Sequence, residues 1–160
     1  MSTTRDNLAH DIRGVLIHVE GDSLLLPNAA VAEVLSFSAP DPVAGAPDWL
    51  LGSIRWRGWQ MPLVAFSRMA GIADEQGGLG SKVVVLKALG GNPKAPYFAV
   101  LTQGFPRLVT VPRDELLQHD DGEPLPDGVL ARVTLREDSA LVPDLARIEA
   151  RIQEGLQQAA

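Results

Sequence analysis

The distribution of glycine and proline is the feature that most limits how this chain can fold. The sequence has 15 glycines and 12 prolines among its 160 residues, and they are spread along the chain instead of being gathered in one region. Both residue types interrupt regular structure, so they leave only short uninterrupted segments. This spacing favours many short strands over long helices, and the length suits one domain with a buried core.

The segments between these breaks have the composition of β-strands. Valine, isoleucine, leucine and aromatic residues dominate them, as is typical of strands that face a core. The predicted strands cover residues 14–19, 24–26, 30–37, 49–56, 60–66, 82–89, 97–101, 108–111, 129–135 and 140–142. Residues 67–71 and 113–118 are each expected to form one helical turn.

The C-terminal segment is the one that predicts a longer helix. Pro143 suits a first helical turn, and Asp144 suits the positive end of the helix dipole. One apolar stripe follows from the spacing of Leu145, Ile148, Ile152 and Leu156. The pattern favours a helix that closes the end of a barrel, and a helix that binds a partner remains the alternative.

The order of these segments predicts a single domain with an internal division. Residues 1–12 are polar and are expected to form a flexible tail, and the domain then covers residues 13–157. A glycine-rich polar linker at 74–81 separates two runs of strands. We therefore expect two small antiparallel barrels in one compact unit, with the subdomain division near 74–81.

Composition excludes several classes of protein. The chain has no cysteine, so disulfides, thiolate metal sites and cysteine nucleophiles are excluded. Its net charge of −6 and pI of about 5.0 disfavour binding to nucleic acid. The polar N-terminus lacks the apolar core of a signal peptide, and no stretch approaches the roughly 18–20 apolar residues of a membrane span. Cytoplasmic location is expected.

No pattern of catalytic or metal-binding residues is present in the sequence. His10, His18 and His119 stand alone, without the neighbours that a catalytic or metal site needs. The carboxylates between 120 and 123 lack the EF-hand spacing, and the glycines at 77–82 precede a strand, unlike those of a phosphate-binding loop. We expect no enzymatic activity, no metal and no cofactor.

The most informative stretch is 49–59, which contains all three tryptophans and two arginines. Tryptophan and arginine are enriched at binding hot spots, because one buries a large area and the other forms forked hydrogen bonds. Two alternatives remain open. The tryptophans can be core residues, or Arg55, Trp56, Arg57 and Trp59 can bind single-stranded nucleic acid.

This stretch and its flanks resemble the CheW-like domain. Residues 31–34 (VAEV) match the family's V-x-E-V/I strand end, and a loop with proline follows. Residues 49–64 (WLLGSIRWRGWQMPLV) then match its aromatic or apolar residue followed by x-x-G-x-I-x-x-R-G-x-x-x-P-V/L. The second half matches more loosely, at 83–86, 97–101 and 141–145, and the resemblance covers about residues 13–155.

The resemblance implies a fold and a function. The fold is all-β, with two SH3-like five-stranded barrels packed on a shared apolar core and a C-terminal helix. The function is that of a non-enzymatic adaptor that couples chemoreceptors to a CheA-type histidine kinase. CheW-like domains bind the regulatory domain of the kinase end to end, and they hold the tip of a chemoreceptor coiled coil in the groove between the barrels.

The resemblance also implies a set of partner-binding residues. The family's arginine before glycine maps to Arg57, and it is expected to contact the glutamate of the V-x-E motif, Glu33. An ion pair that only holds the first barrel together is the alternative. The candidate partner-binding residues are Glu33, Trp49, Ile54, Arg55, Trp56, Arg57, Gly58 and Trp59.

Two departures from the family pattern distinguish this chain from flagellar adaptors. Where members usually have aspartate in V-x-D-L, residues 64–66 are VAF, and the usual V-D of the second half is Leu101-Thr102. The chain is more similar to the auxiliary CheW-like proteins of chemosensory systems that govern type IV pili and twitching motility (Chp-type systems).

Overall fold

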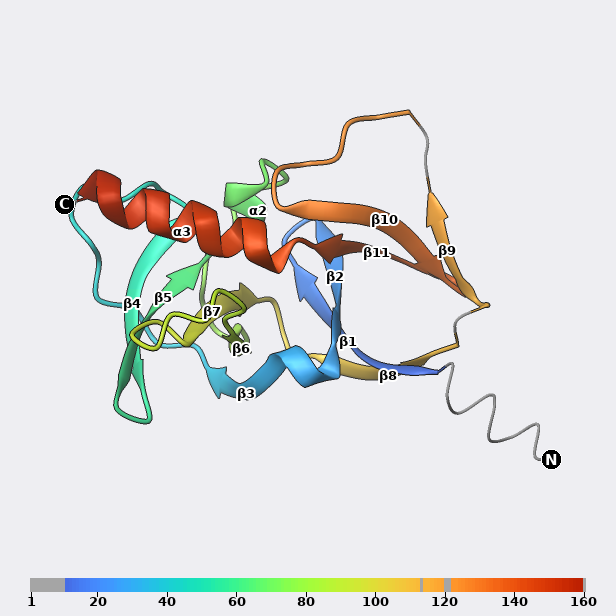
Figure 1. The fold of residues 1–160 in the computed structure, drawn as a ribbon, viewed down its shortest axis with the longest axis horizontal. Coiled ribbons are helices and arrows are strands. Elements are labelled where there is room, and N and C mark those ends of the chain that lie inside the picture. Colours follow the sequence, from blue (N-terminus) through green and yellow to red (C-terminus); the bar gives the residue numbers. More distant parts are fainter. Residues whose placement is uncertain (1–10, 113, 120–121, 160) are drawn as a thin grey trace.

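The structure is a computed structural model that describes residues 11–112, 114–119 and 122–159. Eleven strands occur in this part of the chain (Figure 1). They are β1 (Ile12–Val19), β2 (Asp22–Pro27), β3 (Val31–Ser36), β4 (Leu50–Trp56), β5 (Trp59–Val64), β6 (Lys82–Lys87), β7 (Tyr97–Thr102), β8 (Arg107–Val111), β9 (Leu116–His119), β10 (Val129–Leu135) and β11 (Asp138–Pro143). The helical elements are the 3₁₀ turn η1 (Asn28–Ala30), the short helix α2 (Phe66–Met69) and the C-terminal helix α3 (Leu145–Ala159).

The strands form two sheets. The six-stranded sheet has the order β8-β1-β2-β11-β10-β9, and the five-stranded sheet has the order β3-β6-β7-β5-β4. Most neighbouring strands are antiparallel, and the exceptions are the parallel pairs β2–β11 and β5–β7. The six-stranded sheet therefore combines strands from both ends of the chain, whereas the five-stranded sheet comes entirely from the middle.

The predicted division at 74–81 is wrong for the sheets. β3, before this segment, pairs with β6 after it, so that Glu33 lies opposite Val85. β1 likewise pairs with β8, with Val15 opposite Leu108. Strand partners are chosen by complementary apolar faces and not by proximity in sequence, so the order of the strand runs did not predict the division. Residues 74–81 connect α2 to β6 without forming a helix or strand.

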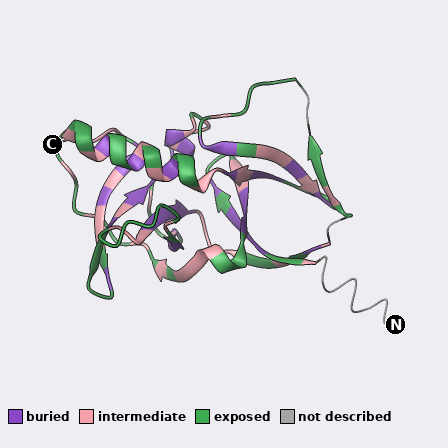
Figure 2. Cartoon of the chain, viewed as in Figure 1, coloured by how far each residue is buried: buried purple, intermediate pink, exposed green. Residues whose placement is uncertain are grey.

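A shared apolar core lies between the two sheets and α3 (Figure 2). Ile17 of β1, Phe98 of β7 and Ile148 of α3 are all buried in it. Each sheet also has a smaller cluster of its own, around Leu16 in the six-stranded sheet and around Leu63 in the five-stranded one. Leu16 and Ile17 are neighbours on opposite faces, so both faces of β1 are covered. This explains the unbroken apolar runs that several strands show.

The C-terminal helix packs as its sequence predicted. Ile148 and Ile152 are buried against the shared core. Asp144 caps the N-terminus, because its Oδ1 accepts a hydrogen bond from the backbone N–H of Arg147 at 3.1 Å. Pro143, expected in the first turn, is instead the last residue of β11. The stripe therefore closes the core, as favoured from the sequence.

Two other expectations need correction. The helical turn expected at 113–118 is wrong where the structure describes this segment, because β9 begins at Leu116 and pairs with β10, and Leu116 packs against the core of the six-stranded sheet. The tail was expected to cover residues 1–12, but Ile12 already belongs to β1 and lies opposite Val111. Residues 1–10 lie outside the described part of the chain. No helix within that part is long and apolar enough to cross a membrane.

Candidate functional site

The β4–β5 hairpin forms the centre of the candidate site. Trp56 and Trp59 lie opposite each other at its end, and Arg57 and Gly58 make the two-residue turn between them. Both turn residues have positive φ, 49° for Arg57 and 80° for Gly58, as a type I′ hairpin turn requires. Glycine adopts this conformation freely, but an arginine pays roughly 1–2 kcal/mol for it. Strain of this kind is concentrated at functional positions.

The carboxylate of Glu33 holds the hairpin in place. Its Oε2 accepts a hydrogen bond from the indole Nε1 of Trp56 at 2.9 Å, and its Oε1 accepts one from the guanidinium of Arg57 at 2.7 Å. Glu33 belongs to β3 and Trp56 to β4, which are the two edge strands of the five-stranded sheet. These side-chain bonds join the two edges, where the described residues form no backbone ladder.

The two bonds to Glu33 differ in what they contribute. The Arg57 side chain is 69 % exposed, and exposed ion pairs contribute about 0–1 kcal/mol. The indole of Trp56 is buried, and a hydrogen bond to a charged group contributes about 1.5–3 kcal/mol. The bond from Trp56 therefore contributes most of the stability that joins the two edge strands. The guanidinium of Arg57 lies 4.9 Å from the Trp56 ring centroid and keeps its outer N–H donors available to a partner.

Tyr97 of β7 packs against the hairpin, and the sequence did not predict it as a residue of the site. Its ring meets Trp56 edge to face at 4.9 Å between centroids and Trp59 at 6.2 Å. Trp59, which is 38 % exposed, has Tyr97 as its aromatic neighbour. Tyr97 stands in an ordinary apolar strand far along the chain, so no motif marks it. Only the strand pairing reveals that it fixes the orientation of Trp59.

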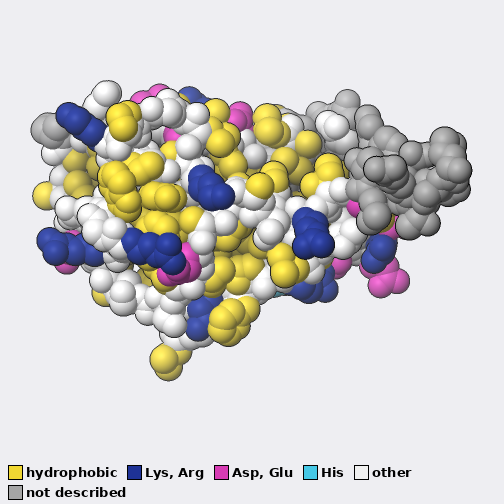
Figure 3. All heavy atoms as spheres, turned by 60° about the horizontal axis from the view of Figure 1, so that its bottom comes forward, with side chains coloured by type: hydrophobic (Ala, Val, Ile, Leu, Met, Phe, Trp, Pro, Cys, Tyr) yellow, Lys and Arg dark blue, Asp and Glu magenta, His cyan; other side chains and the backbone are white. Residues whose placement is uncertain are grey.

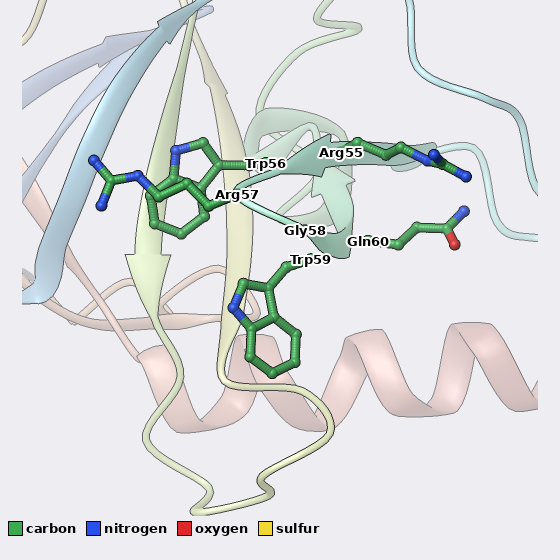
Figure 4. Close-up of a pocket in the computed structure, with 6 residues that line it drawn as sticks. All are labelled: Arg55, Trp56, Arg57, Gly58, Trp59 and Gln60. Atoms are coloured by element: carbon green, nitrogen blue, oxygen red, sulfur yellow. The ribbon is translucent and has the colours of Figure 1, made fainter.

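An open hollow of about 460 Å³ lies around the turn and is lined by residues 55–60. Figure 4 shows that Arg55 and Gln60 project to one side of the hairpin, away from Trp56 and Trp59. Arg55 is exposed and forms no ion pair with any residue that the structure describes. The hairpin thus presents two guanidinium groups and one accessible indole.

Two of the predicted site residues lie away from this surface. Trp49 is only 5 % exposed and sits in the shared core under α3, where the guanidinium of Arg151 lies 5.2 Å from its ring. Ile54 is half-buried and packs against the core of the five-stranded sheet. The structure therefore brings together Glu33 and residues 55–59 at this surface, but not Trp49 or Ile54. Because Trp56 is also buried, its ring face is not open for stacking a nucleic-acid base.

A second surface consists of exposed apolar side chains near the place where the two sheets meet. Phe105 and Leu108 are each 73 % exposed, and Val34 projects from β3. Lys82, which lies opposite Ser36 of β3, places its Nζ 4.4 Å from the ring centroid of Phe105. Figure 3 brings the lower side of Figure 1 forward and shows apolar side chains gathered over this face. We call Val34, Phe105 and Leu108 the inter-sheet patch.

Two histidines in the described ranges have polar partners. His18 bonds to the hydroxyl of Ser23 at 2.9 Å, and His119 bonds to Thr134. No group of three or more histidine, aspartate and glutamate side chains there is arranged to hold a metal ion. His10, Asp120 and Asp121 lie outside the described residues. The arrangement at the hairpin is suited to binding.

The family model of the CheW-like domain matches residues 13–153, which is most of the chain. The chain belongs to the CheW-like domain family. Its fold is also similar to that of the scaffolding protein TtCheW from Thermoanaerobacter tengcongensis, with a TM-score of 0.70 and 13 % sequence identity over 82 % of this chain and 88 % of that one. A search of curated proteins found no match.

Membership of the CheW-like family agrees with the geometry. The all-β fold of two SH3-like barrels with a C-terminal helix is confirmed. The structure differs from the expected five strands per barrel in one sheet, because β9 adds a sixth strand at the edge beside β10. The contact that the family resemblance implied between Arg57 and Glu33 is present at 2.7 Å.

Proposed function

We propose that this CheW-like protein is a cytoplasmic, non-enzymatic adaptor that couples chemoreceptors to a CheA-type histidine kinase. The observation that carries this proposal is the strained, exposed Arg57-Gly58 turn, which Glu33 and Trp56 hold at the end of the five-stranded barrel. This turn places the exposed guanidinium of Arg57 on the same hairpin as Arg55 and the exposed indole of Trp59, and arginine with tryptophan is the composition typical of binding hot spots. The similar TtCheW is itself described as a scaffolding protein.

The hairpin is the surface that we assign to the regulatory domain of the kinase. Arg57 has N–H groups that remain directed to solvent after one bond to Glu33, and Arg55 has no ion-pair partner among the described residues. Trp59 adds an exposed apolar contact area on the same hairpin, and the ring of Tyr97 supports it. Arginine and tryptophan together form the most common type of hot spot, so a partner that docks end to end on this barrel has an anchor.

The inter-sheet patch is the surface that we assign to the chemoreceptor tip. Phe105, which contacts Lys82 of β6, and Leu108 of β8 each expose a large apolar side chain, and such side chains mark interaction sites when they are contiguous. A coiled-coil tip offers apolar side chains of matching character. β3 contributes Glu33 to the first surface and Val34 to the second. The exposed groups of the first surface lie on the β4–β5 hairpin, whereas Phe105 and Leu108 of the second lie before and in β8, so we expect both partners to bind at once, as an adaptor requires.

Calorimetric titration of the protein with the regulatory domain of the CheA-type kinase tests the kinase surface. We expect micromolar affinity, about −8 kcal/mol, and a clear loss of affinity for Arg57→Ala. Arg136→Ala is the matched control, because Arg136 also has positive φ, at 57°, in a hairpin turn and also forms an exposed ion pair, with Glu115 at 2.9 Å. Equal affinity for Arg57→Ala and wild type contradicts the assignment.

We also propose that the pathway is that of type IV pili. The sequences VAF at 64–66 and Leu101-Thr102, which differ from the flagellar pattern, support this assignment. Deletion of the gene is expected to impair twitching motility and to leave swimming intact. Impaired swimming with normal twitching would place the protein in the flagellar pathway instead.

A further inference from the structure

A completely buried carboxyl group lies in the segment that joins α2 to β6. Glu75 has no solvent exposure. Its Oε2 accepts hydrogen bonds from the backbone N–H of Glu20 at 2.8 Å and from the side-chain Nε2 of Gln103 at 3.1 Å. Its Oε1 is buried without a hydrogen-bond partner among the described residues. Ionisation would leave negative charge on this buried oxygen without a partner, so the site disfavours the ionised form.

This carboxyl group lies at the joint between the two sheets. Glu20 belongs to the turn between β1 and β2 of the six-stranded sheet, and Gln103 directly follows β7 of the five-stranded sheet. The backbone N–H of Gln103 also donates to the carbonyl of His18 at 2.7 Å. Ser67 of α2 donates its hydroxyl to the carbonyl of Glu20 at 2.6 Å. Glu75 is therefore bonded to both sheets at once.

The charges around Glu75 do not compensate for its burial. Burial raises the pKa of Glu75 above 4.5, and the nearby carboxylate of Glu20 raises it further. Hydrogen bonds from the backbone of Glu20, the side chain of Gln103 and the backbone of Ser67 lower the pKa in part. Arg68 of α2 is engaged elsewhere, with Asp74 at 3.2 Å, and the described residues provide no cation paired with Glu75. The partner that follows β7 is the neutral Gln103, whose backbone N–H bonds to the His18 carbonyl of β1, and the His18 ring is bonded to Ser23.

We propose that Glu75 is a proton-dependent clamp between the two sheets. In its neutral form it keeps segment 74–81 closed on the β1–β2 turn and the end of β7. When it loses its proton, the segment opens so that water reaches the carboxylate. Exposed glycines at positions 78 and 80 give the segment the freedom to open. This device is independent of the adaptor role.

The direction of the effect follows from the sign of the pKa change. The closed form has the higher pKa, so its stability is fully present below the pKa of the open form. It is lost as the pH rises through the pKa of the closed form. Opening breaks the bonds to Glu20 and Gln103, and with them one of the links that set the two sheets relative to each other.

Hydrogen–deuterium exchange of the full-length chain tests the clamp. We expect the amides of residues 18–22, 75–81 and 103–104 to lose protection as the pH rises above 4.5 and through the raised pKa of Glu75, after correction for intrinsic exchange. Glu75→Gln, which mimics the neutral acid, is expected to abolish this pH dependence. The control is Glu137→Gln, because Glu137 is an exposed glutamate in the β10–β11 turn. Protection that is independent of pH in the wild type, or an unchanged pH dependence in Glu75→Gln, overturns the proposal.

A second measurement does not depend on the variant being folded. Nuclear magnetic resonance of the wild-type chain can follow the Glu75 side-chain carboxyl carbon, the amide of Glu20 and the side-chain amide of Gln103 through the same titration. We expect all three to shift together with one pKa above 4.5. If the carboxyl titrates at or below 4.5, or if the two amides do not follow it, Glu75 is not a clamp.

Discussion

Glu33 and Trp56 connect the two opposite edges of the five-stranded sheet through a hydrogen bond of 2.9 Å between the indole Nε1 and Oε2. The same carboxylate accepts the bond from Arg57. Closing the barrel and positioning the exposed guanidinium are therefore done by one side chain. The two roles can be separated by substitution, because the buried bond to Trp56 and the exposed bond to Arg57 use different oxygens.

Removal of the shared carboxylate is expected to destabilise the fold. In Glu33→Ala the buried indole N–H of Trp56 loses its acceptor, and an unsatisfied buried donor costs about 1–3 kcal/mol. Glu33→Gln keeps an acceptor oxygen and is expected to recover part of this loss. Urea unfolding of both variants measures the free energies. A Glu33→Ala protein as stable as the wild type would show that the bond does not close the barrel.

A substitution of Arg57 is expected to reduce binding to the kinase domain without reducing the stability of the fold. Asparagine before glycine is the preferred pair in a type I′ turn, so Arg57→Asn relieves backbone strain while it removes an exposed ion pair. We expect its unfolding free energy to equal or exceed that of the wild type, because the relieved strain of roughly 1–2 kcal/mol is at least as large as the lost exposed pair of about 0–1 kcal/mol, with a marked loss of affinity for the kinase domain. If instead stability falls and affinity is retained, Arg57 serves the fold and not the partner.

Because the ring of Tyr97 contacts Trp56 and Trp59, we expect the mobility of Trp59 and the affinity for the kinase domain to depend on that ring. Tyr97→Phe keeps both edge-to-face contacts and is expected to behave like the wild type. Tyr97→Leu loses two aromatic pairs, each worth about 0.5–1.5 kcal/mol, and frees Trp59. Tryptophan fluorescence anisotropy and kinase-domain affinity both report this change. If Tyr97→Phe and Tyr97→Leu give the same anisotropy and the same kinase-domain affinity, the ring of Tyr97 does not support the site.

The attachment of α3 is expected to weaken in acid. A hydrogen bond from Arg147, with the charges of Arg147 and Arg151, lowers the pKa of Asp127 below its ordinary value of 3.8. The stability from this carboxylate is therefore present above pH 3.8 and is lost as the pH falls through the lower pKa of the folded state.

Asp127→Asn is expected to be less stable than the wild type at neutral pH, and the difference is expected to shrink below pH 3.8, where the wild-type carboxyl also becomes neutral. Denaturant unfolding across this range checks the effect, with the exposed Asp41→Asn as control. A difference that persists unchanged in acid would mean that the charge of Asp127 is not involved.

The sequence predicted the strands well where local composition and burial agree. The runs that became β6 and β7 are apolar on both faces, and β-branched or aromatic residues dominate them. β9 was missed because its four residues are held by pairing with β10, a tertiary contact that local composition does not encode. The sheet membership of β1 and β2 depends in the same way on pairing with β8 and β11.

The candidate site was predicted in part. The Arg57–Glu33 contact followed from the family motif, but the burial of Trp49 did not, because the sequence does not distinguish a core tryptophan from an exposed one such as Trp59. Tyr97 and Glu75 lie outside any motif. Their positions result from the pairing of distant strands and from the path of the 74–81 segment, which only the fold determines.

The adaptor proposal is tested most directly by co-sedimentation of the CheA-type kinase with chemoreceptor-containing membranes, with and without this protein. We expect the kinase to sediment with the receptors when the protein is present, to do so less with Arg57→Ala, and to do so normally with Arg136→Ala. Leu108→Asp in the inter-sheet patch is expected to leave kinase binding intact and to release both from the membranes. Kinase sedimentation that is unchanged by the presence of the wild-type protein would contradict the adaptor role.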